Sequence, residues 1–404
     1  MVPRLGRRGP PEVSPRLAET TVLNMGPQHP ATHGVLRLVL ELDGETVLRC
    51  VPEIGYLHTG IEKNVEHHTW QQAITDTDRM DYLSPLMNNL GFCLAAERLL
   101  GIPVPERCNY IRVLMAELSR IASHLVWIGT YALDLGAVSV YFYAFQAREA
   151  IMDMYETVSG ARMNLSYIRV GGLQYDIPPQ LAAMVDRFLQ EFPRWMHDFR
   201  ALLDDNPIFV GRTKGIGLMS ADQCRGFGVS GPSLRAAGVA YDVRKAAPYS
   251  GYEAFDFNVP TRPEGDCYAR YVVRLAEMDQ SARIVRQAID GMPEGPWRSE
   301  DRKITLPPRE ELQTSMESLI HHFKLASTGF KVPAGEVYQA IESPRGEIGF
   351  FVVSDGGTHP YRMRVRAPSY FNTQALKYIL EGQLVADAVA AVGSLDMIMG
   401  EVDR

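Results

Sequence analysis

The stretch NYIRVLMAELSRIASHLVWIGTYALDLGA, from Asn109 to Ala137, decides the architecture of this 404-residue chain. Apolar side chains recur in it at steps of three and four residues, the spacing of one face of an α-helix. The positions that carry this pattern are Ile111, Leu114, Met115, Leu118, Ile121, Ala122, Leu125 and Ile128. A polar stripe accompanies them, made of Arg112, Ser119, Arg120 and Ser123. The pattern predicts one long helix.

Further helices are predicted on both sides of this one. The sequence turns helical from Asp76 to about Gly101, and long helical patterns cover residues 140–160, 179–203 and 266–292. A short apolar helix is predicted at 375–393. Long helices that follow one another along a chain favour a bundle.

Two β-hairpins are predicted near the ends of the chain. Alternating apolar and polar residues flank Asp43-Gly44, which predicts a hairpin at about 34–52. The stretch GEVYQAIESPRGEIGFFVVSDGG predicts a second hairpin that turns at about Pro344–Gly346. Between them, GRTKGIGLMS and GPSLRAAGVAYDVRKAAPYSGYEAFDF are rich in glycine and predict turns with short aromatic strands.

Together these patterns predict an α+β fold, a central helical bundle with β-rich N- and C-terminal lobes. We expect an N-terminal extension at 1–22, a β-rich lobe at 23–75, a bundle domain with glycine-rich β insertions at 76–330, and a C-terminal β-hairpin and short helix at 331–404. The basic, proline-rich start has no apolar segment after it, so we expect no signal peptide. Because no run of about 18 uncharged apolar residues occurs, we also expect no membrane-spanning helix.

Composition excludes several classes of function. A formal net charge of -7 argues against a general nucleic-acid-binding protein. The five cysteines are scattered and form no C-x-x-C pair, which favours reduced thiols and leaves no thiolate cluster for zinc or an iron–sulfur centre. The glycine-rich segments match neither a P-loop nor a dinucleotide fingerprint, and no G-x-S-x-G motif occurs.

Two histidine pairs are candidate metal ligands. His29 and His33 lie in GPQHPATHG, but Pro30 between them makes a helix that would place both rings on one face improbable. His67 and His68 are adjacent, and neighbouring residues on a helix point about 100° apart. Histidines that form hydrogen bonds within a turn are therefore the simpler interpretation of both pairs.

Two acidic stretches also have a structural interpretation. TDTDRMDYLSP, from Thr75 to Pro85, resembles a helix start with Thr77 or Asp78 as the N-cap. In YALDLGA, Asp134 interrupts an apolar stretch near a helix end, and a buried carboxylate needs a partner. A histidine or an arginine would satisfy it.

Taken together, the motifs resemble one family. LNMGPQHPATHGVLRLVLELDGE, GYLHTGIEK, TDRMDYLSP, ELSRIASHLVWIGTYALDLGA, SGYEAFDF, GEVYQAIESPRGE, SDGGTHPYRMRVRAPSY and MGEVDR occur in order from Leu23 to Arg404. They are similar to motifs of the 49-kDa subunit of NADH–quinone oxidoreductase, the proton-pumping respiratory complex I. That family is similar in fold to the large subunit of nickel–iron hydrogenases. A hydrogenase binds nickel through two C-x-x-C pairs, which are absent here, so this rival function is rejected.

The resemblance implies a set of site residues. His33 of the HPxTH motif and Tyr82 of DRMDY are implied to bind the quinone head group, and Asp134 of ALDLG is implied to partner the histidine. Arg79 of DRMDY is implied to lie beside a [4Fe–4S] cluster in a neighbouring subunit. Histidine can deliver a proton at neutral pH, whereas tyrosine is a good hydrogen-bond donor to a developing oxyanion. We expect catalysis to involve His33, Tyr82 and Asp134.

The chain departs from some relatives at two positions. Thr59 stands where several relatives have an arginine, and Asn164 stands where some have a histidine near the same cluster. Because Asn164 cannot titrate, we expect the potential of that cluster to depend only weakly on pH.

The resemblance also implies the setting of the chain. It would bind no cofactor or metal itself, take quinone as substrate, and act only within the complex. Its implied partners are the subunit with the terminal [4Fe–4S] cluster, the 30-kDa-type subunit, the two-cluster ferredoxin-like subunit and the membrane subunit of the quinone tunnel, with no nucleic acid. The implied location is peripheral, on the cytoplasmic side of the cell membrane. The alternative is a scaffold or assembly subunit with a vestigial hydrogenase-like pocket.

Overall fold

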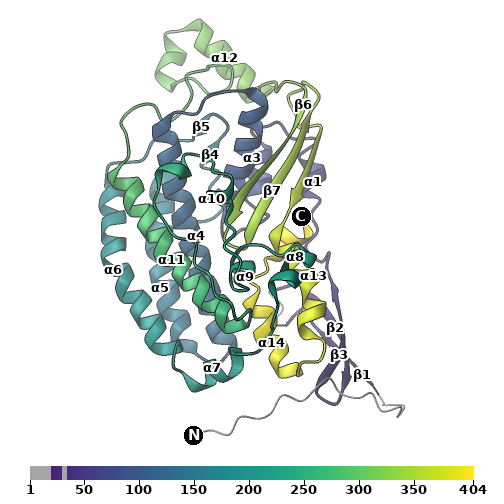
Figure 1. Cartoon of the computed structure of the whole chain (residues 1–404). Helices are drawn as coiled ribbons and strands as arrows, with labels where there is room; N and C mark the ends of the chain where they lie inside the picture. The colour runs from purple at the N-terminus through teal and green to yellow at the C-terminus, as the bar shows by residue number, and fades with distance from the viewer. Residues whose placement is uncertain (1–19, 30–33) are drawn as a thin grey trace.

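A bundle of long helices forms the centre of the molecule (Figure 1). The computed structural model describes residues 20–29 and 34–404. The long helices are α3 (Pro85–Leu100), α4 (Glu106–Asp134), α5 (Val138–Ser159), α6 (Gln180–Leu203) and α11 (Cys267–Asp290). They confirm the helical patterns of the sequence to within a few residues at most ends.

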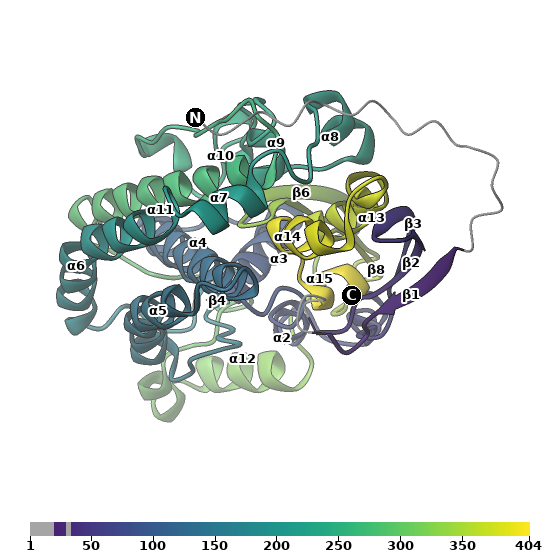
Figure 2. The same ribbon diagram turned by 90° about the horizontal axis from the view of Figure 1, so that it is seen from below.

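Helix α4 lies at the middle of this bundle, in contact with α3, α5, α11 and α14 (Figure 2). Every residue from Ile111 to Leu125 is buried. The polar stripe is therefore buried together with the apolar face, which amphipathic spacing alone does not predict. Its charges need partners inside the protein, because an unpaired buried charge is costly.

The segment before residue 100 forms several separate helices where the sequence predicts one helical stretch from Asp76 to about Gly101. It contains α1 (Ile61–Asn64) and α2 (Ala73–Thr77), and a separate helix, α3, begins only at Pro85. The prediction of Thr77 or Asp78 as an N-cap is wrong, because Thr77 ends α2 and Asp78 caps its C-terminal end. The N-cap of α3 is Ser84, followed by Pro85, a residue suited to the first turn because it has no N–H to leave unpaired.

The N-terminal sheet has the strand order β1–β2–β3 and is antiparallel. Its strands are β1 (Thr21–Met25), β2 (Arg37–Asp43) and β3 (Thr46–Glu53). The hairpin at Asp43-Gly44 is confirmed, whereas β1 had no clear signal in the sequence. Alternate residues of β2 are buried in an apolar cluster that the sheet shares with α13 and α14.

The glycine-rich segments after α6 differ from the prediction. The predicted short aromatic strands are wrong, since residues 207–257 form short helices and turns: α7 (Pro207–Thr213), α8 (Ala221–Phe227), α9 (Gly231–Arg235), α10 (Val243–Ala246) and η2 (Tyr252–Ala254). The aromatic residues are enriched there because they fill the core. Tyr249 and Tyr252 pack edge to face at 4.9 Å, and both are buried.

The C-terminal sheet has the order β6–β7–β8 and packs against α3. Its strands are β6 (Gly335–Ser343), β7 (Gly346–Ser354) and β8 (Arg362–Arg366). The hairpin turn at Pro344–Arg345 is confirmed. Gly91 allows α3 to approach closely, since a Cβ there would lie 2.4 Å from the Phe350 ring.

The remaining elements close both ends of the bundle. The predicted helix at 375–393 is wrong as a single element, because a break at Gly382, with φ +83°, separates α13 from α14. A small hairpin, an ordered 3₁₀ turn and four helices complete the chain: β4 (Ile168–Arg169), β5 (Gly172–Leu173), η3 (Arg309–Gln313), α12 (Met316–Ser327), α13 (Pro368–Leu380), α14 (Val385–Ser394) and α15 (Met399–Asp403). The α+β class is confirmed, while the division at residues 22, 75 and 330 stays a prediction.

Candidate functional site

Tyr82 and Arg79 line one pocket of 420 Å³ between the α1–α2 region and α15. The remaining lining residues are Leu57, Thr59, Ile61, Asn64, Asp76 and Gly400. Tyr82 is half-buried, and burial together with the charge of Asp81 raises the pKa of its phenol. Arg79 is exposed, and its Nη1 donates to the Thr75 carbonyl over 2.5 Å. The pocket therefore combines a neutral phenol with a guanidinium that remains accessible.

Helix α15 fixes the backbone of this pocket. A Cβ on Gly400 would lie 2.6 Å from the Met80 carbonyl oxygen and 2.9 Å from that of Arg79, so only glycine allows this approach. The Asp403 carboxylate accepts hydrogen bonds from the backbone N–H groups of Gly55 and Leu57 at 2.8 and 2.7 Å. The loops around Thr59 and Tyr82 are thus held by residues near position 400.

Behind Tyr82 lies a group of buried charges that we call the Tyr82-side cluster. It consists of Asp81, Arg345, Asp396 and Glu401, all buried. Arg345 donates to the Asp81 carboxylate at 2.9 Å and to the Asp396 carboxylate at 3.2 Å. Glu401 has no ion pair within residues 20–29 and 34–404, and its carboxylate accepts hydrogen bonds from the Ser369 hydroxyl and backbone N–H.

Glu401 is the unusual carboxylate of this cluster. Burial, with the negative charge of Asp81, raises its pKa to about 7, although Ser369 and Arg345 oppose that shift. One guanidinium is paired with two carboxylates there, which leaves the third carboxylate to hold a proton near neutrality.

A second group, which we call the interior cluster, lies deeper in the bundle. Its members are Glu117, Arg120, Arg235, Asp242, Arg244, Glu277 and Glu342, all buried. Arg244 contacts Glu117 at 3.0 Å, and Arg235 contacts both Glu277 and Glu342 at 2.7 Å. Arg120 of the polar stripe of α4 joins the cluster through Glu117 on the same helix, at 3.2 Å. Sequence reasoning found the stripe but not Glu117, the α4 residue that binds Arg244 of α10.

The charges of the interior cluster lower the pKa of three of its four carboxylates, namely Glu117, Glu277 and Asp242. Burial raises the pKa of Glu117, but Arg120 and Arg244 outweigh it and bring that pKa to about 2. Arg235 and His124 act in the same way on Glu277, whose pKa is also about 2. The Nε2 atom of His124 lies 3.1 Å from the Glu277 carboxylate, and burial lowers the pKa of this histidine.

Asp134 is the last residue of α4 and is half-buried. Burial raises its pKa to about 6, and the charge of His29 acts in the opposite direction. The structure therefore brings the first histidine of GPQHPATHG within electrostatic reach of Asp134. His33, the expected quinone ligand, lies outside the described residues, so its pairing with Asp134 stays a prediction.

The other predicted positions lie on the surface or in local contacts. Asn164 is exposed with φ +54°, a left-handed conformation that asparagine tolerates well. His68 pairs with Asp76 at 2.6 Å, which is a local contact rather than a shared site with His67. Among the described residues, no three His, Cys, Asp or Glu side chains gather as metal ligands.

Sequence reasoning missed Arg345 and Glu401 as neighbours of Tyr82. The signal available was weak, because each is a single charge in a short motif, SPRGE or MGEVDR, next to apolar residues. Their connection to Asp81 depends on contacts between segments that are far apart in sequence.

Comparison with known proteins gives first the class, a subunit of a respiratory-chain NADH dehydrogenase. The sequence model of the family described as the 49 kDa subunit of that enzyme matches residues 134–404. The NADH-quinone oxidoreductase D 1 subunit of Solibacter usitatus is 55% identical over 95% of this chain and 94% of its own. The D 2 subunit of Roseiflexus sp. is 56% identical over 96% of this chain and 93% of its own. The D subunit of Geotalea uraniireducens is 53% identical over 96% of this chain and 99% of its own.

The chain therefore belongs to the 49-kDa subunit family of NADH-quinone oxidoreductase, whose bacterial members are named as the D subunit. It is one of the subunits of the complex I enzyme. In the part of the chain that the structure describes, no helix is both long enough and apolar enough to cross a bilayer.

Proposed function

We propose that this chain lines the site at which complex I reduces quinone to quinol. The observation that supports it most directly is the position of Tyr82, half-buried in the wall of a 420 Å³ pocket beside Arg79. A neutral hydrogen-bond donor in a partly dry pocket suits a carbonyl oxygen on which negative charge develops.

Tyr82 and His33 have different tasks in this proposal. The raised pKa of Tyr82 keeps its phenol protonated at neutral pH, so it donates a hydrogen bond to the head group. His33 contributes the group that can transfer a proton, because an unperturbed histidine has a pKa near 6.5.

Asp134 is the proposed partner of His33. A carboxylate fixes the tautomer of a histidine and favours its protonated form. When His33 gives its proton to the quinone, its attraction to Asp134 weakens. We propose that this change in a partly buried charge starts the conformational change that leads to proton pumping.

The electrons come, in this proposal, from a [4Fe–4S] cluster in a neighbouring subunit. Both Arg79 and Asn164 are exposed, which supports their position at a contact with that subunit. The 30-kDa-type, two-cluster ferredoxin-like and quinone-tunnel membrane subunits are further proposed partners, and the proposed place is the cytoplasmic side of the membrane. We also propose that the chain is similar in fold to the large subunit of nickel–iron hydrogenases.

Replacing the Tyr82 hydroxyl in the assembled complex tests the site. We expect Tyr82→Phe to lower NADH–quinone turnover by about tenfold or more, because it removes one donor to the developing oxyanion. Electron transfer from NADH to an artificial acceptor upstream should stay unchanged. Tyr361→Phe makes the same change at a tyrosine that is 65% exposed, and it should alter neither rate. Unchanged quinone turnover in both Tyr82→Phe and His33→Ala would refute the assignment.

A further inference from the structure

A second pocket, of 580 Å³, is lined by three arginines and by His322 of α12. Helix α12 lies at one end of the bundle (Figure 1). We call this pocket the arginine pocket and define it by Arg169, Arg298 and Arg309, with Trp297 and Leu306 in its wall. None of the three guanidiniums forms an ion pair with any residue that the structure describes, and that of Arg298 lies over the Trp297 ring at 4.5 Å. The acidic side chain in the lining is Glu310, which is exposed.

The backbone holds two of these arginines in a fixed arrangement. Arg169 pairs with Gly172 across the β4–β5 hairpin, and Gly172 forms an antiparallel bridge with Arg298. Residues directly opposite each other in antiparallel pairs lie on the same face. Because a Cβ on Gly172 would lie only 2.5 Å from that of Arg298, the middle position must be glycine, and no side chain separates the two arginines.

The hairpin below the pocket is rigidly supported. The buried Arg112 donates to the carbonyl oxygens of Arg169 and Gly172 at 2.8 and 3.2 Å. Its ion pair with Glu97 has a shortest distance of 2.5 Å, and Glu97 also accepts the Gly171 N–H at 2.8 Å. The two arginines therefore need little further ordering to bind a partner, which favours affinity.

The electrostatics of the pocket call for an anion. Burial lowers the pKa of Arg169 although Cys93 and Asp78 oppose that shift, and burial with the nearby positive charge of Arg302 lowers that of Arg298 against the charge of Glu311. The Nε atom of Arg169 is buried without a hydrogen-bond partner among residues 20–29 and 34–404. A bound carboxylate would stabilise the charged form of both guanidiniums and accept a hydrogen bond from the Nε atom of Arg169.

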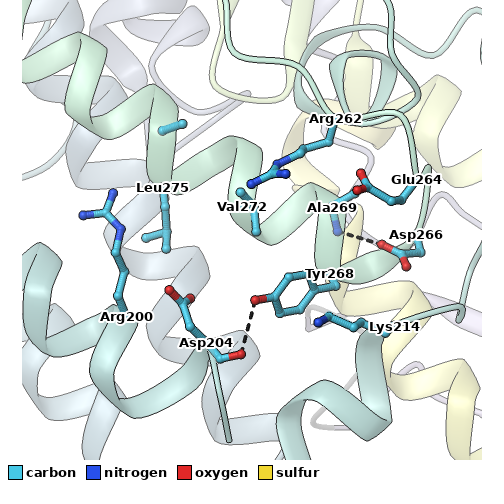
Figure 3. A pocket seen from close by; sticks show the side chains of 11 residues that line it. Arg200, Asp204, Lys214, Arg262, Glu264, Asp266, Tyr268, Ala269, Val272 and Leu275 are labelled. Atoms are coloured by element: carbon cyan, nitrogen blue, oxygen red, sulfur yellow. Dashed lines mark hydrogen bonds between the residues drawn. The ribbon is translucent and has the colours of Figure 1, made fainter.

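The pocket drawn in Figure 3 shows that three cationic side chains alone do not make an anion-binding site. It contains Arg200, Lys214 and Arg262, but Asp204, Glu264 and Asp266 lie in the same lining. Two of these acids also have donors of their own, since Asp204 accepts from the Tyr271 hydroxyl and Asp266 from the Ala269 N–H. Its charges are balanced, whereas those of the arginine pocket are not.

The surface next to the arginine pocket favours a protein partner. His322 joins the pocket lining from α12, whose outer face exposes Met316, Leu319, Ile320 and Phe323 at helical spacing. An exposed apolar face beside arginine and aromatic residues is typical of a protein interface. A membrane-surface helix would instead carry several basic residues on its polar face, but α12 has one lysine and one glutamate.

We propose that the arginine pocket binds an acidic segment of another subunit of the complex, whose carboxylate is held by Arg169 and Arg298. The chain is part of that complex, so neighbouring subunits are present to supply the segment. This proposal does not depend on the quinone site.

Site-specific cross-linking in the assembled complex tests the proposal without altering an arginine. A photo-reactive amino acid at Leu306, which is 42% exposed in the pocket wall, should cross-link to a segment of another subunit that contains an aspartate or glutamate. A cross-link to lipid, to a segment without acids or to nothing overturns the proposal.

A charge swap then tests the ion pair itself. Arg298→Glu should lower retention of the cross-linked subunit after a high-salt wash by roughly tenfold or more, because it places a carboxylate against a carboxylate. Exchanging the acid of the partner for arginine in the same strain should restore retention. Arg262→Glu, in the charge-balanced pocket of Figure 3, makes the same change and should not respond to that exchange. If Arg298→Glu has no effect, or the exchange fails to rescue it, the proposal is wrong.

Discussion

The interior cluster and the Tyr82-side cluster are both buried, yet Glu117 of the first and Glu401 of the second have pKa values that are shifted in opposite directions. Glu117 has a pKa of about 2, whereas Glu401 has a pKa of about 7. Burial alone raises both values. The difference comes from the guanidiniums, since Glu117 is ion-paired with two of them and Glu401 with none among the described residues.

The numbers of arginines and carboxylates in each cluster help to explain which carboxylates have raised pKa values. In the interior cluster, Arg120, Arg235 and Arg244 face four carboxylates, and the fourth, Glu342, has a raised pKa through burial and the charge of Asp242. In the Tyr82-side cluster Arg345 pairs with Asp81 and Asp396, and the third carboxylate, Glu401, has no ion pair among the described residues. A buried carboxylate therefore has a lowered pKa where guanidinium charge outweighs burial, as at Glu117. Its pKa is raised where burial and a neighbouring carboxylate outweigh the guanidiniums, as at Glu342, even though Arg235 pairs with it at 2.7 Å.

Removing Glu117 should have the largest effect on the comparison. Glu117→Ala leaves Arg120 and Arg244 without this shared partner, and breaking such a buried pair costs about 3–5 kcal/mol of the free energy of unfolding. The measurements are the yield of assembled complex and its thermal unfolding midpoint. Ser281→Ala, which removes one hydrogen bond of 2.6 Å to Glu117, should cost only about 1 kcal/mol. A Glu117→Ala complex as stable as the wild type would show that the cluster does not hold the bundle together.

Replacing Glu401 tests the difference between the two clusters, because it should change how the free energy of unfolding depends on pH. Its folded-state pKa of about 7 lies above the ordinary 4.5, so the folded state binds the extra proton between these values. Stability from this group is fully present below pH 4.5 and is lost as pH rises through 7. We expect Glu401→Gln to remove about 2–3 kcal/mol of the pH dependence of unfolding between pH 5 and 8.

Unfolding midpoints of the complex at several pH values measure this effect. The matched control is Glu336→Gln at an exposed carboxylate on β6, which should leave the pH dependence as it is in the wild type. Equal pH dependence in Glu401→Gln and the wild type would mean that Glu401 is ionised throughout.

The smallest effect on stability is expected for an arginine–carboxylate ion pair on the surface. Arg283 and Asp256 form an ion pair whose side chains are 46% and 74% exposed. Arg283→Ala should change the free energy of unfolding by less than about 1 kcal/mol, because solvent screens the attraction. Denaturation of the variant and the wild-type complex at low and high salt checks this, and a loss above about 2 kcal/mol would contradict the ranking.

The sequence predicts the elements of this fold better than their ends and partners. Helix α4 and both hairpins carry local signals, namely apolar spacing and turn residues, and were predicted within a few residues. The break at Gly382 and the short helices around Tyr249 were missed, because one glycine in a helical pattern is weak and buried aromatics resemble a strand.

The candidate site was predictable only in part. Tyr82 and Arg79 belong to one short motif, and the structure brings them to one pocket. Arg345 and Glu401 reach Asp81 from segments more than 250 positions away, and no local pattern reports such a contact. The electrostatic link of Asp134 to His29 likewise depends on tertiary structure, while His33 lies outside the described residues.

The contacts made by α15 also set the order in which the Tyr82 pocket can be assembled in the cell. Asp403 holds the backbone of Gly55 across 348 positions of sequence, and Gly400 packs against Arg79 and Met80. At a translation rate of about 5–20 residues per second, about 20–70 s separate the synthesis of these two ends of the pocket. The pocket can therefore be completed only after residue 403 has been synthesised. Until then, the loops around Gly55 and Arg79 lack their contacts with α15.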